Sequence, residues 1–318
     1  MSTFSIKKPS SVIEFWFQAN LWEYSTDKPG NVGPSQEINQ ITLKDYDRVN
    51  HALRDYLFAK IFELPRISLG NLIFSLVDTM MQTAPHQNLL LGNILLISPL
   101  FLASVHLSHK FPHRSNITRP QFWHEVIQII AKSTVDDTLK VVDAIRLAQP
   151  GGLVNPGGKS VPADWDILNS TFPDQVVKRK IHLISLFQKS ASYDLISHEW
   201  AYGYQICQNW LYTHNLSQIP PVPTITKEIT KKVKQIFLEF LASYPDSLIQ
   251  RKNSLQEAKN IQILAQKILH SGGKDSIMGS KLLQNLTKKL SQREGKFNPG
   301  TTADFTAAIL FLRRFLIS

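Results

Sequence analysis

The sequence has almost no cysteine, and its amino-terminal segment lacks the features of a signal peptide. Cys207 is the one cysteine among 318 residues, so no disulfide can form within the chain, and a reducing compartment is favoured. The first residues are poor in apolar side chains and carry Lys7 and Lys8, which argues against a secretion signal. We therefore expect a cytoplasmic protein whose core is large enough to be stable without a disulfide or a metal.

Charged residues are also scarce, at 19%, and residues 87–109 contain no Asp, Glu, Lys or Arg. A run of this length can cross a bilayer. Gly92, Asn93 and Pro99 interrupt it, however, and no second run of similar length exists. The run predicts a buried central helix with a break near Pro99 rather than a membrane span, and no membrane partner is expected.

The net charge of +10 is unevenly distributed. Residues 224–296 hold 14 Lys or Arg and 6 Asp or Glu. Such a segment suits polyanions, although solvated helix faces are the simpler explanation. Its lysines alternate with an amphipathic apolar stripe and form no recognisable nucleic-acid module, so no nucleic-acid partner is predicted.

Apolar residues recur at helical spacing along most of the chain, and strict alternation is short and rare, which predicts an all-α fold. Capping-box spacing marks three helix starts: Thr42 with Asp45, Thr118 with Gln121, and Ser254 with Glu257. The segments LGNLIFSL (69–76) and LGNILLIS (91–98) echo each other, as two packed helices that approach at their glycines would. The Pro- and Gly-rich connectors are short, so one domain over residues 1–318, with helices packed round the central one, is preferred.

Common nucleotide motifs are absent. The sequence has no GxGxxG pattern, so a Rossmann dinucleotide site is unsupported. The GGKS segment at 157–160 resembles the end of a P-loop, but Leu153 stands where that motif needs glycine. Nucleotide binding, if present, has to use another arrangement.

Aspartates stand at the starts of several predicted helices: Asp136, Asp137, Asp194, Asp246 and Asp304. Taken singly, each is more often a helix cap than a catalytic group. Together with the basic pair Arg251–Lys252, however, helix-end carboxylates around one centre could hold a metal-bound polyphosphate.

The order of the motifs then carries a resemblance. The chain reads, in order, KPGNV (28–32), NLLLGNILLISPL (88–100), TVDDTLKVVDAIRLAQPGGL (134–153), DLISHEWAYGY (194–204), PDSLIQRK (245–252) and NPGTTADFTAAILFL (298–312). This succession resembles the triphosphoribosyl-dephospho-coenzyme A synthase family over nearly the whole chain. The resemblance implies a helical enzyme that transfers the triphosphoribosyl group of ATP to the 2′-hydroxyl of 3′-dephospho-coenzyme A and releases adenine. The product is a prosthetic-group precursor for an acyl carrier protein.

The resemblance also implies site residues and a cofactor, Mg²⁺ bound with ATP. Asp136 and Asp137 are the expected catalytic pair, and Asp246 and Asp304 the expected metal ligands. The residues expected to bind substrate or nucleotide are Lys28, Gly30, Asn31, Asn88, Arg146, Asp194, Glu199, Arg251, Lys252, Thr301 and Thr302.

The chain departs from the family pattern at several positions. A glycine commonly follows the Arg251–Lys252 pair, where this chain has Ser254, and the loop after KPGNV lacks the family's usual acidic and aromatic pattern. Leu89 and Leu90 replace polar residues, and Tyr193 stands where arginine is common. Two alternatives therefore stay open: a diverged enzyme acting on another phosphorylated cofactor precursor, and a non-catalytic helical protein that binds nucleotides or a partner.

Overall fold

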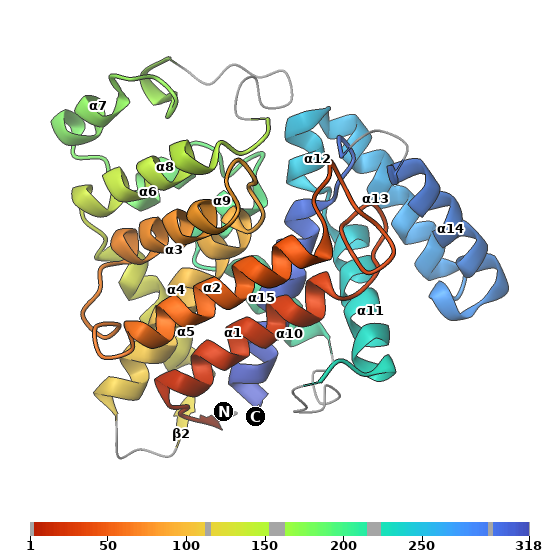
Figure 1. The fold of residues 1–318 in the computed structure, drawn as a ribbon, viewed down its shortest axis with the longest axis horizontal. Helices are drawn as coiled ribbons and strands as arrows, with labels where there is room; N and C mark the ends of the chain where they lie inside the picture. Colours follow the sequence, from red (N-terminus) through yellow and green to blue (C-terminus); the bar gives the residue numbers. More distant parts are fainter. Residues whose placement is uncertain (1–2, 112–115, 153–162, 215–223, 292–294, 318) are drawn as a thin grey trace.

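The computed structural model describes residues 3–111, 116–152, 163–214, 224–291 and 295–317, and the GGKS segment lies outside them (Figure 1). The helices are α1 (Pro9–Tyr24), α2 (Leu43–Ala59), α3 (Leu69–Thr83), α4 (Leu91–Lys110), α5 (Arg119–Ala131), α6 (Val135–Ala148), α7 (Phe172–Arg179), α8 (Leu183–Gln188), α9 (Leu195–Tyr202), α10 (Gln205–Thr213), α11 (Lys227–Ser243), α12 (Ser247–Lys252), α13 (Leu255–His270), α14 (Ile277–Ser291) and α15 (Gly300–Ile317). Two short 3-10 helices, η2 (Ala163–Trp165) and η3 (Gly273–Asp275), and a small antiparallel sheet of β1 (Thr3–Ser5) and β2 (Asn116–Thr118) complete the described elements. The predicted all-α fold is confirmed.

Local capping sets where several helices begin. Thr42 and Asp45 form a reciprocal capping box at the start of α2, and Thr118 and Gln121 form another at α5, as predicted. At α13, the Ser254 hydroxyl accepts a hydrogen bond from the Glu257 amide at 3.2 Å. These ends need no tertiary contact, which is why the sequence alone predicts them.

Helix α4 is the buried helix that the uncharged run predicts. It packs against α1, α3, α5, α9 and α15, and 83% of its most apolar stretch is buried inside the protein. A helix of this length and composition could cross a membrane, but burial identifies it as a core helix.

The predicted break at Pro99 is wrong, because α4 continues through this residue. Proline has no amide hydrogen, so the carbonyl of Leu95, four residues earlier, loses its helical partner. The indole Nε1 of Trp200 on α9 donates to that carbonyl at 3.1 Å. The Tyr204 hydroxyl donates to the next carbonyl, of Leu96, at 2.6 Å. A neighbouring helix therefore satisfies the backbone that proline disrupts.

The glycines of the two echoing segments face other helices than expected. Helices α3 and α4 do pack together. A Cβ atom on Gly70 would lie 2.4 Å from the Cα of Asp137 on α6, however. One on Gly92 would lie 2.0 Å from a carboxylate oxygen of Asp304 on α15. Without a side chain at Gly70, α6 can pack closely on α3, and without one at Gly92, α15 can pack closely on α4. Gly92 thereby brings α4 against Asp304, a predicted site residue.

A second apolar cluster lies among α11, α13 and α14, which occupy one edge of the molecule in Figure 1. The excess positive charge lies largely on the outside of these helices. Lys231 pairs with Asp275 at 2.9 Å and Lys232 with Glu228 at 2.8 Å, while Lys288 is exposed. These lysines form solvated helix faces. Among the described residues of the basic segment, Arg251 and Lys252 are the cations that line the cavity described next.

Candidate active site

A cavity of about 320 Å³ lies where segments distant in sequence meet. Its wall is formed by the end of α1 and the loop after it, the start of α4, the loop after α6, the turn between α8 and α9, α12 and the start of α15. Seven of the sequence-predicted residues line it: Asn31, Asn88, Asp194, Arg251, Lys252, Thr301 and Asp304. The other predicted residues are described but lie outside this lining: Lys28, Gly30, Asp136, Asp137, Arg146, Glu199, Asp246 and Thr302.

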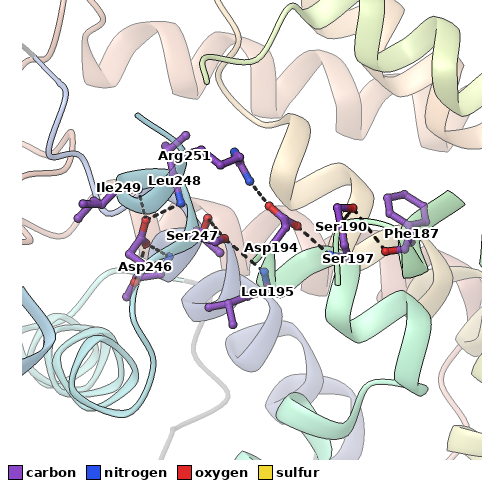
Figure 2. A network of polar contacts seen from close by, with 12 residues as sticks. Phe187, Ser190, Asp194, Leu195, Ser197, Asp246, Ser247, Leu248, Ile249 and Arg251 are labelled. Carbon is purple, nitrogen blue, oxygen red and sulfur yellow. Dashed lines mark hydrogen bonds and ion pairs between the residues drawn. The ribbon is translucent and has the colours of Figure 1, made fainter. Parts of the chain in front are cut away.

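Arg251, in the last turn of α12, provides the most buried cation of the cavity wall. Figure 2 shows its guanidinium paired with the Asp194 carboxylate. The other oxygen of Asp194 accepts from the Ser197 amide at 2.8 Å and so caps α9. Burial lowers the pKa of Arg251 to about 10, so it stays cationic at neutral pH. Its Nε has no hydrogen-bond partner within the described residues, which leaves donors for an anionic ligand.

Lys252 places a second cation beside Arg251. Its Nζ donates to the Gly295 carbonyl at 3.3 Å, and burial together with the Arg251 charge lowers the pKa of Lys252. The glycine pair after α6 lies directly on these side chains. A Cβ atom on Gly151 would come within 2.9 Å of the Lys252 Cε, and one on Gly152 within 2.9 Å of the Arg251 Cβ. The Gly151–Gly152 pair and the Arg251–Lys252 pair thus pack directly against each other.

Asp304 brings a carboxyl group to the cavity from the start of α15. It lies against Gly92 and accepts a hydrogen bond from the Asn93 backbone amide. Burial raises the pKa of Asp304 well above its ordinary value, and the nearby Glu23 and Asp246 carboxylates raise it further. Arg251 acts in the opposite direction. Such surroundings favour the protonated form of a carboxyl group.

Glu23, in the last turn of α1, also lines the cavity, and the sequence reasoning missed it. It is 6% exposed, and its carboxylate pairs with the Lys28 ammonium at 3.0 Å. One sequence signal was available. Glu23 follows Trp16 and Ala19 by seven and four residues, so it lies on an apolar helix face where an acid is out of place.

Lys28 does not point into the cavity, contrary to the prediction that it binds phosphate. Its Nζ donates to the carbonyls of Glu23 at 2.5 Å and Thr26 at 2.8 Å, besides pairing with the Glu23 carboxylate. The side chain is fully buried. Burial lowers the pKa of Lys28, while Glu23 opposes this shift. Lys28 is the counterion of a cavity residue and not itself a ligand-facing group.

The KPGNV turn contributes through Asn31. Its side-chain amide donates to Asn298 at 2.9 Å, and both residues line the cavity. Gly30 has a positive φ of 68°, and a Cβ atom there would lie 2.6 Å from Leu290. This glycine is needed for packing against α14 rather than for contact with a phosphate. Asn88 lines the cavity while accepting the Leu91 amide at 3.3 Å at the start of α4.

Asp246 does not fit the role of metal ligand that was predicted for it. It is fully buried, and one carboxylate oxygen accepts from the Leu248 and Ile249 amides at 2.9 and 3.0 Å (Figure 2). The other accepts from the amide and hydroxyl of Thr302 at 2.7 and 2.8 Å. With both oxygens engaged, Asp246 joins α12 to α15. Thr302 is likewise structural, whereas Thr301 lines the cavity and bonds Ser247 at 3.0 Å.

Glu199 and Arg146 also bond within the protein instead of lining the cavity. Glu199 is fully buried and accepts the Ile206 and Cys207 amides at 2.8 and 3.0 Å, which fixes the start of α10. Arg146 donates from Nε to the Ile167 carbonyl at 2.6 Å. Ile167 is part of the cavity wall, so Arg146 holds that wall in place.

Asp137 forms a capping box with Thr134 at the start of α6, and its remaining oxygen accepts the Gly70 amide at 2.8 Å. Burial alone would raise its pKa, but the hydrogen bonds from Ser68, Thr134 and Gly70 together lower it. Its neighbour Asp136 also lies away from the cavity lining. The structure therefore gives the predicted catalytic pair no access to the cavity.

Three of the departures from the family pattern lie in the cavity wall, whereas Ser254 does not line it. Leu89 and Leu90 are 7% and 4% exposed and line the cavity, as does Tyr193. They make part of its wall apolar where polar groups were expected.

One family of known proteins matches this chain both in sequence pattern and in fold. The family model described as ATP:dephospho-CoA triphosphoribosyl transferase matches residues 9–316. A solved structure from Archaeoglobus fulgidus, described as a candidate triphosphoribosyl-dephospho-coA synthase, matches with a TM-score of 0.58 at 20% identity. The match covers 84% of this chain and 99% of that one, and at this identity it shows a shared fold. No curated protein sequence matches the chain. Because the family model spans nearly the whole sequence, the chain belongs to the ATP:dephospho-CoA triphosphoribosyl transferase family, whose members are enzymes.

Proposed function

We propose that the cavity is the active site and that it binds ATP and 3′-dephospho-coenzyme A. The triphosphoribosyl group of ATP would pass to the 2′-hydroxyl of the acceptor, with release of adenine. The observation that carries this assignment is the meeting of two half-buried cations, Arg251 and Lys252, with the carboxyl of Asp304 in one cavity.

The basic pair is suited to the triphosphate. Arg251 offers its unpaired Nε donor from a half-buried position, where charge-assisted hydrogen bonds are stronger than in water. Gly151 and Gly152 lie on the same side chains without Cβ atoms in the way, so backbone can approach a phosphate there. This division leaves the apolar wall around Leu89 and Leu90 for uncharged parts of the substrates.

Asp304 is assigned to the leaving group. Breaking the bond between C1′ and adenine places negative charge on the base and positive charge on the ribose ring. A protonated Asp304 would donate its proton to the departing adenine and become a carboxylate that stabilises the ribose cation. Its raised pKa supports this role over that of a resident metal ligand.

The residues present do not provide a resident Mg²⁺ site. Within the described residues, no group of three or more His, Cys, Asp or Glu side chains is placed to hold a metal ion. The Asp246 oxygens are occupied by protein donors. Mg²⁺ would instead enter as part of the substrate MgATP, bound to phosphate oxygens, where it offsets the triphosphate charge.

We further propose that the enzyme acts in the cytoplasm and serves an acyl carrier protein, as the family resemblance implies. The chain's own departures from the family pattern bear on the identity of the acceptor. Leu89, Leu90 and Tyr193 in the wall favour, as a second candidate, an acceptor related to dephospho-coenzyme A but less polar where these side chains lie.

The test is release of adenine. Purified protein is incubated with ATP, Mg²⁺ and dephospho-coenzyme A, and adenine is measured by chromatography, with a panel of phosphorylated acceptors in parallel. Asp304→Asn should abolish release. Asp275→Asn, which changes an exposed aspartate of η3, should leave it unchanged. Absence of adenine with every acceptor would refute the assignment.

A further inference from the structure

We infer that Glu23 is the catalytic base that removes the proton from the attacking hydroxyl group, and that Lys28 is its positioning residue. This inference rests on the proposed transfer reaction and names a residue that the sequence motifs did not indicate. It is carried by the place of Glu23 in the cavity wall and by the contacts of Lys28.

The first step is the location of the carboxylate. Glu23 comes from α1, and Asp304 comes from α15, which packs against α1. Both side chains line the cavity, together with Tyr46. Desolvation raises the pKa of the partly buried Tyr46 phenol, and the charges of Glu23 and Asp304 raise it further. The two acids therefore share one region of the cavity, as a reaction with one proton donor and one acceptor requires.

The second step is the difference between the two surroundings. Glu23 has a cation in direct contact, because the Lys28 ammonium lies 3.0 Å from its carboxylate. Asp304 is in contact with Gly92 and the Asn93 amide and feels Arg251 at longer range. A contact cation favours the ionised form of a carboxyl group. Burial raises the pKa of Glu23, as it raises that of Asp304, but the Lys28 ammonium in contact with Glu23 opposes the shift there. Two acids in such different surroundings suit opposite roles in proton transfer.

The third step is the rigidity of Lys28. Its Nζ is held by the carbonyls of Glu23 and Thr26 in addition to the ion pair, and its side chain has no exposure to solvent. These bonds leave the ammonium no route to a phosphate in the cavity. They do fix the point from which it acts on Glu23, which is what a positioning residue needs.

Glu23 and Asp304 together account for both protons that move in the reaction. The acceptor oxygen forms a bond to C1′ as the bond from C1′ to adenine breaks. The hydroxyl proton passes to the Glu23 carboxylate, and the Asp304 proton passes to adenine. After the products leave, exchange with water returns Glu23 to its ionised form and Asp304 to its protonated form.

The experiment compares adenine release across pH for matched variants. Glu23→Gln should lower the rate by about 10²- to 10⁴-fold, the usual effect of losing a general base. ATP affinity, measured by calorimetry, should change little. Glu23→Asp should keep the loss of activity on the acid side of the profile, at a reduced rate. Lys28→Met removes the contact cation and so raises the pKa of Glu23, which should move the acid-side loss to higher pH.

A double variant distinguishes a loss of catalysis from a loss of folding. Glu23→Gln alone leaves the buried Lys28 charge without its partner, which destabilises the protein, whereas Glu23→Gln with Lys28→Met removes both charges at similar volume. The double variant should fold and be as inactive as the single one. Wild-type activity in Glu23→Gln or in the double variant would overturn the role of Glu23 but not the proposed reaction. An acid-side loss of activity at the same pH in Lys28→Met as in the wild type would do the same. Absence of adenine release from the unmodified protein would instead overturn the proposed reaction, and this inference with it.

Discussion

Replacing Gly92 with alanine tests whether the placement of the Asp304 carboxyl controls activity. The new Cβ atom would lie 2.0 Å from Oδ2 and 2.8 Å from Cγ of Asp304. Non-bonded heavy atoms of this kind rest about 3.5 Å apart, so the carboxyl has to move by more than about 1 Å. Because a displacement of about 1 Å can lower a rate about 10²-fold, we expect adenine release to fall about 100-fold.

The fold should survive this substitution, because the clash involves the end of a side chain. Alanine in place of a helical glycine stabilises by about 1 kcal/mol, and displacement of the carboxyl offsets this gain. In an Asp304→Ala background the main clash is absent, so the same Gly92→Ala change should raise the free energy of unfolding by up to about 1 kcal/mol. Urea unfolding of the wild type, Gly92→Ala, Asp304→Ala and the double variant measures this difference in the free energy of unfolding.

Two results would refute the reasoning. One is normal adenine release by Gly92→Ala, which would mean that the position of the Asp304 carboxyl does not matter to the reaction. The other is an equal effect of Gly92→Ala on stability with and without Asp304, since the predicted contact would then be absent.

Three further predictions concern carboxylates. Asp246→Asn loses the carboxylate oxygen that accepts from the Thr302 amide and hydroxyl. Because each such bond contributes about 1.5–3 kcal/mol, the free energy of unfolding measured in urea should fall by about 3 kcal/mol. A changed Mg²⁺ requirement for adenine release would contradict a structural role for Asp246. Asp137→Asn should cost about 1 kcal/mol of stability at neutral pH, with unaltered adenine release per folded molecule. Since the folded-state pKa of Asp137 is lowered, its contribution is present above its unfolded pKa of about 3.9 and lost as pH falls through the folded value, so thermal melts of variant and wild type should converge in acid. Asp304→Asn should melt at a higher temperature than the wild type, by a margin that grows as pH rises from about 4 toward the raised pKa of Asp304; equal melting temperatures at all pH values would contradict that shift.

Local features of the fold were predictable from the sequence. The capping boxes at Thr42 and Thr118 depend on residues three positions apart, and both were found. The break at Pro99 was predicted wrongly because the compensating donor, Trp200, lies on another helix about a hundred residues later. Short-range patterns do not record such long-range hydrogen bonds.

The motifs predict cavity-lining residues correctly where the charged side chain faces the cavity, and incorrectly where it faces the protein interior. Arg251 and Asp304 line the cavity as expected. Lys28 and Asp246 carry the same motif information, but their partners lie in the interior and fix them there. Glu23 was missed for the converse reason: its place on the apolar face of Trp16 and Ala19 marks a buried acid, but no local pattern shows that folding brings this acid into a cavity wall. The motif order identifies the family, whereas the direction of each side chain depends on packing.

The pairing of α1 with α15 has a consequence for how the enzyme becomes active. The cavity needs Glu23 from the first helix and Asp304 from the last described one, so its wall is made of contacts with very large sequence separation. Such contacts raise the contact order, and bringing distant segments together carries a loop-closure entropy that is met only late in folding. We expect refolding experiments to show helix formation well before adenine release returns. The active site should be the last part of this protein to be assembled.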